Sequence, residues 1–443
     1  MALTQNYLQG HLKTIINRLI RNKFVRNVAI LATGTAGAQT INMLFSPIVT
    51  RIYNPEVFGL LGVFTAAVNI LTPIAAFSYP IAIVLPKKNV EAKGIIKLSI
   101  CISLIFAVFL VFVFLFGGNK LLELVGAGAI TAFVLLIPLN MFFSALLQVS
   151  QQWLIRKKQF HITAKVAIIQ AIVINSSKVG FGWFFPVAAV LIVLTTIGSV
   201  LHAGLLFFGA YKTEETQKTS IKEQQKISLL KLAKQYYDFP FYRTPQVLIN
   251  TISQTLPVFM LSAFFGPASA GFYTICRRVL SIPSQLIGKS VGDVFYPRIT
   301  EAAQKKENLT KLVVKTTLGL IAIGFFPFVI VIVFGPWLFG FVFGSKWIMA
   351  GEYARWLSLM LFFNFINKPA VATIPVLGLQ KGLMIYEIFS TSSKLGALYM
   401  GIIMLADEKL AIALFSIFGA LAYIFLIIWV IMSCASYNRR INE

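Results

Sequence analysis

The stretch IIKLSICISLIFAVFLVFVFLF, residues 95–116, contains a single charged side chain, Lys97, in 22 positions. A helix needs about 20 consecutive, largely apolar residues to cross the hydrocarbon core of a bilayer. This segment is therefore predicted to be a transmembrane helix. Comparable runs recur along the whole chain and predict about twelve spans. They lie near residues 27–50, 58–85, 95–116, 127–154, 161–182, 186–210, 243–265, 268–296, 312–334, 353–378, 382–405 and 409–435.

The composition of the chain is that of a protein dissolved in lipid. Of its 443 residues, 58% are hydrophobic and only 12% are charged. A soluble domain carries about 25% charged residues, because its surface must face water. So few charged side chains would not cover a water-soluble globule of this length. We therefore predict an all-α polytopic membrane protein.

The positive charges lie in short clusters between the apolar runs. The chain has 39 Lys and Arg against 15 Asp and Glu, a formal net charge of +24. In a soluble protein such an excess would indicate nucleic acid. Here the clusters follow every second span, as the positive-inside rule describes. The sequence thus predicts a multi-pass protein of the bacterial inner (plasma) membrane, with both termini cytoplasmic and no nucleic-acid partner.

One long polar connection, residues 211–234, lies near the midpoint of the chain. We predict that it is a cytoplasmic linker between two six-helix lobes, residues 27–210 (N-lobe) and 235–443 (C-lobe). The basic residues 1–26 are predicted to form an interfacial segment on the cytoplasmic leaflet.

An internal sequence repeat supports two lobes. Pro55 and Gly59 enter the second span as Pro267 and Gly271 enter the eighth, about half the chain length later. Such a repeat, with six spans in each half, predicts lobes related by a pseudo-two-fold axis along the membrane normal.

No feature of the sequence indicates an enzyme, a cofactor or a metal. The three cysteines and three histidines lie far apart without ligand spacing. Gly288-Lys289-Ser290 resembles the end of a phosphate-binding loop, but Pro283 stands where that motif needs its first glycine. Carboxylates are few, and no predicted outward loop is long enough to carry catalytic groups in a domain of its own. We therefore expect neither catalysis nor a cofactor.

Polar side chains follow one face of several predicted spans. Their spacing of three or four residues places them in line along a helix. Such a face must pack against other helices or line a water-filled cavity, and interhelical hydrogen bonding explains the neutral residues equally well. The first-span members are Thr35, Gln39, Asn42 and Ser46, and the seventh-span members are Arg243, Gln246, Asn250 and Ser253.

Cations inside the predicted spans are harder to explain by packing. A cation at the bilayer centre costs about 2.5–3.5 kcal/mol even on insertion scales. Asp293 and Glu387 are the intramembrane carboxylates, and they are candidates for ion coupling or for ordinary salt bridges. Lys178 lies near a span end, where snorkelling to the interface explains it. The remaining excess predicts a visiting anionic ligand, with Arg278 and Lys289 as leading contacts and Lys394, Lys368 and Arg243 as second-rank contacts.

Several segments resemble one family of transporters. The run SPIVTRIYNPEVFG at 46–59 resembles the opening of the polysaccharide repeat-unit (O-antigen, Wzx-type) flippases. These belong to the multidrug/oligosaccharidyl-lipid/polysaccharide exporter superfamily. Further similarities are YYDFP at 236–240, GFY at 271–273 with Arg278 and Pro283, and WIMAGEYA at 347–354. The resemblance covers nearly the whole chain, although Lys368 and Lys394 match no motif of the family.

The resemblance implies a V-shaped pair of lobes around a central cavity. It also implies that undecaprenyl-diphosphate-linked oligosaccharide units move from the cytoplasmic to the outer leaflet by alternating access, for surface polysaccharides such as the O-antigen of lipopolysaccharide. The cations would contact the pyrophosphate, and Gln39, Asn42, Gln246 and Asn250 would line the sugar path. The implied partners are this lipid-linked substrate, membrane lipids, and the polymerase and chain-length regulator of the pathway.

Two alternatives remain open at this stage. An ion-coupled multidrug exporter of the same superfamily carries cationic drugs, which favours intramembrane carboxylates over cations. A membrane polysaccharide polymerase would be expected to carry a large outward loop with catalytic groups.

Overall fold

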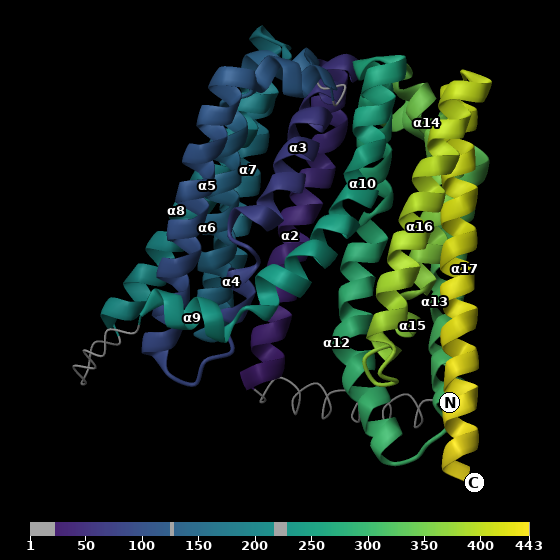
Figure 1. The fold of residues 1–443 in the computed structure, drawn as a ribbon. Helices are drawn as coiled ribbons and strands as arrows, with labels where there is room; N and C mark the ends of the chain where they lie inside the picture. Colours follow the sequence, from purple (N-terminus) through teal and green to yellow (C-terminus); the bar gives the residue numbers. More distant parts are fainter. Residues whose placement is uncertain (1–22, 125–127, 217–227, 443) are drawn as a thin grey trace, which may run out of the picture.

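The computed structural model describes residues 23–124, 128–216 and 228–442, and every regular element in these ranges is a helix (Figure 1). Short 3₁₀ or π turns, η1 to η4, cover Gly128–Phe133, Phe239–Arg243, Ser345–Trp347 and Gly401–Leu405. The first half contains α2 (Lys23–Ile52), α3 (Pro55–Ala75), α4 (Tyr79–Ala82), α5 (Asn89–Leu124), α6 (Leu136–Arg156), α7 (Phe160–Phe184) and α8 (Ala188–Thr216). The second contains α9 (Leu229–Gln235), α10 (Thr244–Phe265), α11 (Pro267–Leu280), α12 (Ile282–Gln304), α13 (Leu309–Phe343), α14 (Ile348–Ile366), α15 (Lys368–Thr373), α16 (Gln380–Met400) and α17 (Glu408–Asn442).

The prediction of an all-helical polytopic membrane protein is confirmed. Within the described ranges, eight helices are long and apolar enough to cross a membrane. Each predicted span coincides with one helix or with two consecutive elements. The count of twelve spans, the lobe boundaries and the two-fold relation between lobes stay predictions. The interfacial segment predicted at residues 1–26 lies largely outside the described residues, which begin at Lys23 in α2.

Three predicted spans are divided between two α-helices, and in each the second helix has a proline in its first turn. The span predicted at 353–378 is divided into α14 and α15, with Pro369 in the first turn of α15. In the span predicted at 58–85, α3 ends at Ala75, and Phe77 and Ser78 take positive φ angles of 47° and 55° before α4 begins. Pro80, in the first turn of α4, has no N–H to donate to the preceding turn, which favours the start of a new helix there. The eighth predicted span is likewise divided into α11 and α12, with Pro283 in the first turn of α12.

A single arginine replaces the helical hydrogen bonds that are lost after α4. The Arg156 side chain, at the end of α6, donates to the backbone carbonyls of Ile83 at 3.3 Å and Pro86 at 2.6 Å. It also donates to Oδ1 of Asn89 at 3.2 Å. Arg156 therefore holds the chain between α4 and α5, besides contributing to the basic cluster after the fourth predicted span.

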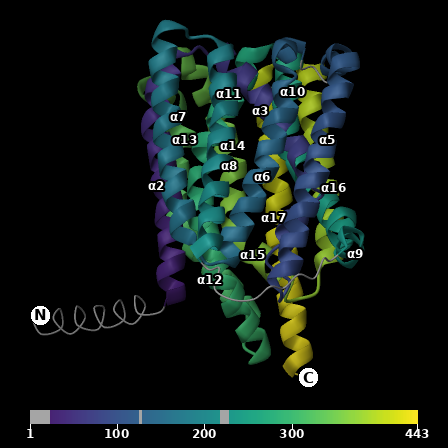
Figure 2. The ribbon, with the colours of Figure 1, turned by 90° about the vertical axis from the view of Figure 1, so that its left-hand side faces the viewer.

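The helices form two groups that stand side by side (Figure 1). In one group α2 packs against α7 and α6 against α8, and in the other α14 packs against α13 and α17. The groups meet where α3 contacts α10 and α11. The largest apolar core lies at this junction and includes Tyr53 and Phe58 from one half and Tyr273 and Trp347 from the other. At the end of the bundle where the C-terminus lies, α12 and α17 extend beyond the other helices (Figures 1 and 2).

The repeated Pro-Gly motifs meet at this junction. A Cβ atom on Gly59 of α3 would overlap the carbonyl oxygen of Pro267, and one on Gly271 of α11 would overlap that of Pro55. Each glycine therefore lies against the first turn of the opposite helix, and only hydrogen side chains permit so close an approach. We call this reciprocal contact, with the residues next to it at 50–54 and 341–347, the seam.

Three hydrogen bonds join the two halves along the seam. Arg51 Nη2 donates to the carbonyl of Phe341 at 3.0 Å, and Lys346 Nζ donates to Asn54 Oδ1 at 2.7 Å. The indole Nε1 of the buried Trp347 donates to a backbone carbonyl, that of Thr50, at 2.9 Å. Arg51 and Lys346 are charged donors that meet neutral acceptors, so their two bonds can be exchanged for water without leaving an ion pair unpaired.

We predict that one methyl group at Gly59 or Gly271 opens the seam. In a variant without the exposed Cys101, cysteines at Asn54 and Lys346 report closure through a short bifunctional thiol cross-linker. Gly59→Ala should slow cross-linking several-fold, since the added Cβ cannot occupy the space of a carbonyl.

The control for this experiment is Gly319→Ala in α13, where the added Cβ would meet no atom within 4 Å. Cross-linking in this variant should match the unmodified protein. Equal rates in Gly59→Ala and Gly319→Ala would refute the role of the seam.

Candidate functional site

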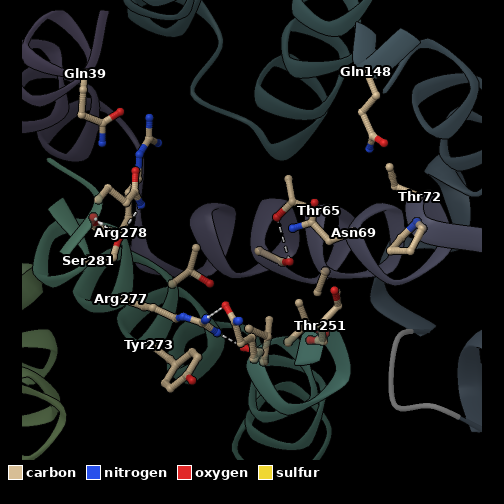
Figure 3. Close-up of a pocket in the computed structure, with 18 residues that line it drawn as sticks. Gln39, Thr65, Asn69, Thr72, Gln148, Thr251, Tyr273, Arg277, Arg278 and Ser281 are labelled. Atoms are coloured by element: carbon tan, nitrogen blue, oxygen red, sulfur yellow. Dashed lines mark hydrogen bonds between the residues drawn. The ribbon is translucent and has the colours of Figure 1, made fainter. Parts of the chain in front are cut away.

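A cavity of about 560 Å³ lies between the two halves (Figure 3). Its walls come from α2, α3 and α6 on one side and from α10, α11 and the start of α12 on the other. On α3 it begins at Gly62, one turn after Gly59, and continues to Pro73. Because α3 starts at the seam, the cavity extends from the seam toward the end of the bundle where the C-terminus lies.

The lining is polar and carries positive but no negative charge. Among the lining residues that the structure describes, Arg277 and Arg278 are the charged ones, and none is Asp or Glu. Most of the remaining lining residues carry neutral amide or hydroxyl groups, such as those of Asn69 and Thr251. An anion with many hydroxyl groups attached is the kind of ligand that such a surface suits.

Arg277 is fixed to a neighbouring helix of its own half. Its guanidinium donates to the backbone carbonyl and to the side-chain Oε1 of Gln254 on α10. Gln254 in turn donates to Asn250, one turn earlier. Arg277 is not among the contacts predicted from the sequence, because the sequence does not indicate which way a charge next to Arg278 on the same helix points.

Arg278 points differently from its neighbour, as expected for consecutive residues about 100° apart on a helix. Its side chain is exposed to the cavity, at the end where Gln39 also lies (Figure 3). In the described part of the chain its guanidinium has no hydrogen-bond or ion-pair partner. Gln39 and Arg278, both selected from the sequence, are thus brought together at one end of the cavity.

A small side pocket extends from this end into the first half. It is lined by Asn42, Ser46, Asn175 and Lys178, and Arg278 enters it from α11. Asn175 Nδ2 donates to Asn42 Oδ1 at 2.7 Å. The free volume of about 10 Å³ has room for at most one water-sized molecule.

Lys178 is the functional candidate that the sequence analysis missed. We attributed it to snorkelling, but the structure places its half-buried side chain in the side pocket, close enough for its ammonium to be repelled by Arg278. Neither cation has an ion-pair partner among the described residues. The signal available in the sequence was the polar face of the span predicted at 161–182, which is α7, since Asn175 and Lys178 are three residues apart on it.

The candidates of the seventh predicted span, residues 243–265, do not line the cavity. Arg243 is exposed at the start of α10, and its Nη1 donates to Gln246 Oε1 at 2.9 Å. Asn250 is exposed and accepts the hydrogen bond from Gln254. The assignment of Gln246 and Asn250 to the sugar path, and of Arg243 to contact with the anionic group, stays a prediction.

Three further candidates lie within the second half. Lys368 Nζ donates to Asn364 Oδ1 at 3.3 Å. Lys394 is 8% exposed, and its Nζ lies 5.7 Å from the centre of the Tyr423 ring. Glu387 is half-buried on the same helix as Lys394.

The leading contact Lys289 and the carboxylate Asp293 both belong to α12, but their side chains lie outside the described part of the structure. Their assigned roles stay predictions.

Comparisons with known proteins agree with this architecture. Residues 48–352 match the family model described as polysaccharide biosynthesis protein. Over 376 residues the chain is 24% identical to the succinoglycan biosynthesis transport protein ExoT of Rhizobium meliloti (strain 1021), covering 80% of this chain and 68% of that protein.

Solved structures show the same fold at low sequence identity. An inward-facing multidrug resistance MATE family transporter of the MOP superfamily superposes with a TM-score of 0.72 at 13% identity, covering 90% of this chain and 96% of that one. The lipid II flippase MurJ in an inward closed conformation gives 0.71 at 15% identity, covering 93% and 90%. The fold is therefore that of MOP superfamily transporters.

We predict that removing an unpaired cation from the side pocket stabilises the protein. Lys178→Met and Arg278→Met each remove a charge that is repelled by its neighbour, so unfolding should cost about 1 kcal/mol more. Thermal unfolding in one detergent measures this difference.

The comparison variant is Arg156→Met, which removes a guanidinium with several carbonyl partners. It should destabilise the protein by about 2 kcal/mol, because those carbonyls lose their donor. Destabilisation of both pocket variants to the same extent as Arg156→Met would show that the pocket cations are structural.

Proposed function

The chain belongs to the polysaccharide biosynthesis protein family, and we propose that it is a lipid-linked oligosaccharide flippase. In this proposal it moves undecaprenyl-diphosphate-linked repeat units from the cytoplasmic to the periplasmic leaflet of a bacterial inner membrane, for surface polysaccharide such as O-antigen. The family resemblance predicted from the sequence is confirmed by the family match. The relative from Rhizobium meliloti, whose name describes a transport protein in succinoglycan biosynthesis, supports the choice of cargo class.

The observation that carries this proposal is the uncompensated positive charge at the seam end of the cavity. Arg278 and Lys178 meet there from opposite halves, with no carboxylate among the described residues that line either space. A diphosphate cannot cross hydrocarbon without partners for its charge. Two unpaired cations, with Arg277 nearby, supply them, and Lys289 remains a proposed further contact.

The rest of the cavity supports a carbohydrate ligand. Hydroxyl and amide side chains at its far end, such as Thr72 and Gln148, can exchange hydrogen bonds with sugar hydroxyls (Figure 3). The polyprenyl tail needs no polar partner, because it can stay in the lipid beside the protein.

We propose a place in the transport cycle for this conformation, based on the position of the seam. The halves are joined at the seam, and the cavity extends toward the end where the C-terminus lies. With the predicted cytoplasmic termini, the cavity is the loading site and the seam is the closed outer gate. Rocking of one half on the other would release the cargo outward. The polymerase and chain-length regulator of the pathway are proposed partners on that side.

The alternative function, export of cationic drugs, is less well supported. An organic cation is stabilised by carboxylates or aromatic faces, whereas the charges of this cavity are arginines. The likeness to a multidrug transporter concerns the fold, which superfamily members with different cargoes share.

We predict that flipping depends on both side-pocket cations. In proteoliposomes with an undecaprenyl-diphosphate-linked oligosaccharide, Arg278→Gln or Lys178→Gln should lower the rate at least about tenfold, a rise of about 1.4 kcal/mol in the activation free energy. The measurement is the fraction of sugar that reaches the opposite leaflet.

A matched control is Lys311→Gln, which removes an exposed cation at the start of α13 and should leave the rate unchanged. Full activity of the Arg278→Gln, Lys178→Gln double variant would exclude the proposed diphosphate site.

A further inference from the structure

The segment that enters the second half, residues 228–243, runs across the outside of the first group of helices (Figures 1 and 2). It contains α9 and the π turn η2, and it continues directly into α10. One side of it is fixed to the first half. Leu232 of α9 is buried against α5, where a Cβ added to Gly94 would overlap its Cδ1 atom. The Tyr79 hydroxyl of α4 donates to the carbonyl of Ala233 at 3.2 Å.

The other side of this segment carries large apolar side chains that no described element covers. More than half of the surface of each of four residues is exposed, namely Leu230, Tyr237, Phe241 and Tyr242. The rings of Tyr237 and Phe241 lie beside each other, with their centres 6.4 Å apart. Apolar surface of this extent is unfavourable in water, so it indicates contact with an apolar partner.

The same segment is positively charged. Lys231, Lys234 and Arg243 are exposed on it, and Asp238 is the one acidic residue between 228 and 243. The neighbouring face of α5 adds a further charge of each sign. Lys97 is exposed three residues after Gly94, and Glu91 is half-buried three residues before it, so both lie on the side of α5 that α9 contacts. With four cations against two carboxylates, the partner is expected to be anionic.

The contact with α5 fixes the depth of this segment in the membrane. Gly94 immediately precedes the apolar run 95–116, so α9 lies at the level where that helix enters the hydrocarbon. Lipid headgroups occupy this level. Tyrosine is enriched there because its ring is apolar and its hydroxyl is polar, and basic amphipathic segments lie in the same layer.

We propose that residues 228–243, together with Lys97, form a binding surface for anionic phospholipid headgroups. The exposed rings insert between lipids, and Lys97, Lys231 and Lys234 contact lipid phosphates, because basic groups next to a membrane helix are attracted to anionic lipids. The segment is fixed to α4 and α5 and continues into α10, so the bound lipids hold the connection between the two halves at the membrane surface. This inference goes beyond the proposed function, since it concerns the surrounding lipid and holds for any cargo.

Fluorescence quenching by spin-labelled lipids tests this proposal on the full-length protein. In a variant without Cys101, a fluorophore is attached to a cysteine at the exposed Gln235 of α9, because the other two cysteines are buried. The protein is reconstituted in phosphatidylcholine with a small, equal fraction of phosphatidylglycerol or phosphatidylcholine spin-labelled on the acyl chain near the headgroup. The labelled phosphatidylglycerol should quench several-fold more strongly, and the ratio should fall at high salt, which screens exposed charges.

The double variant Lys231→Gln, Lys234→Gln removes two exposed cations, so its fold should be retained and its quenching by the two lipids should become nearly equal. The matched control is Lys311→Gln at the start of α13, an exposed lysine whose removal should leave the preference unchanged.

Two results would overturn the proposal. Equal quenching by both lipids without the lysine substitutions would show that the segment does not select anionic lipid. Absence of quenching by either lipid would place the segment in water, where a protein partner rather than lipid would have to cover its apolar side chains.

Discussion

Positive charge held among membrane helices without negative partners is the constraint on which the rest of this structure depends. Each such cation costs about 2.5–3.5 kcal/mol in hydrocarbon, so the interior must be wet or must receive an anion. Arg278 and Lys178 meet this constraint at the junction of the two halves, with amides of Asn42 and Asn175 beside them. The cavity begins next to Arg278, and the apolar faces of the helices turn to lipid.

Two adjacent arginines illustrate how one helix serves two purposes. Arg277 is bound by Gln254, which fixes α11 to α10 within one half. Arg278 extends across the junction into the pocket of the other half. The first keeps its helix in place while the second stays available, and the angle between consecutive residues of a helix is sufficient to separate these tasks.

The fold could be predicted from apolar run lengths, whereas the site could be predicted only in part. Run length identifies membrane helices because lipid leaves the backbone no other way to satisfy its hydrogen bonds. Helical periodicity shows that residues share a face, and for Gln39 and Arg278 that face lines the cavity. It does not show what the face meets, so the place of Lys394 on Tyr423 and of Lys178 beside Arg278 required the tertiary structure.

The reciprocity of the seam has a consequence for how the molecule moves. Gly59 rests on the turn that begins with Pro267, and Gly271 rests on the turn that begins with Pro55, so each contact holds the other in register. Neither can separate while its counterpart stays closed, since both belong to the same pair of rigid helices. We therefore expect the two contacts to part together when the halves separate.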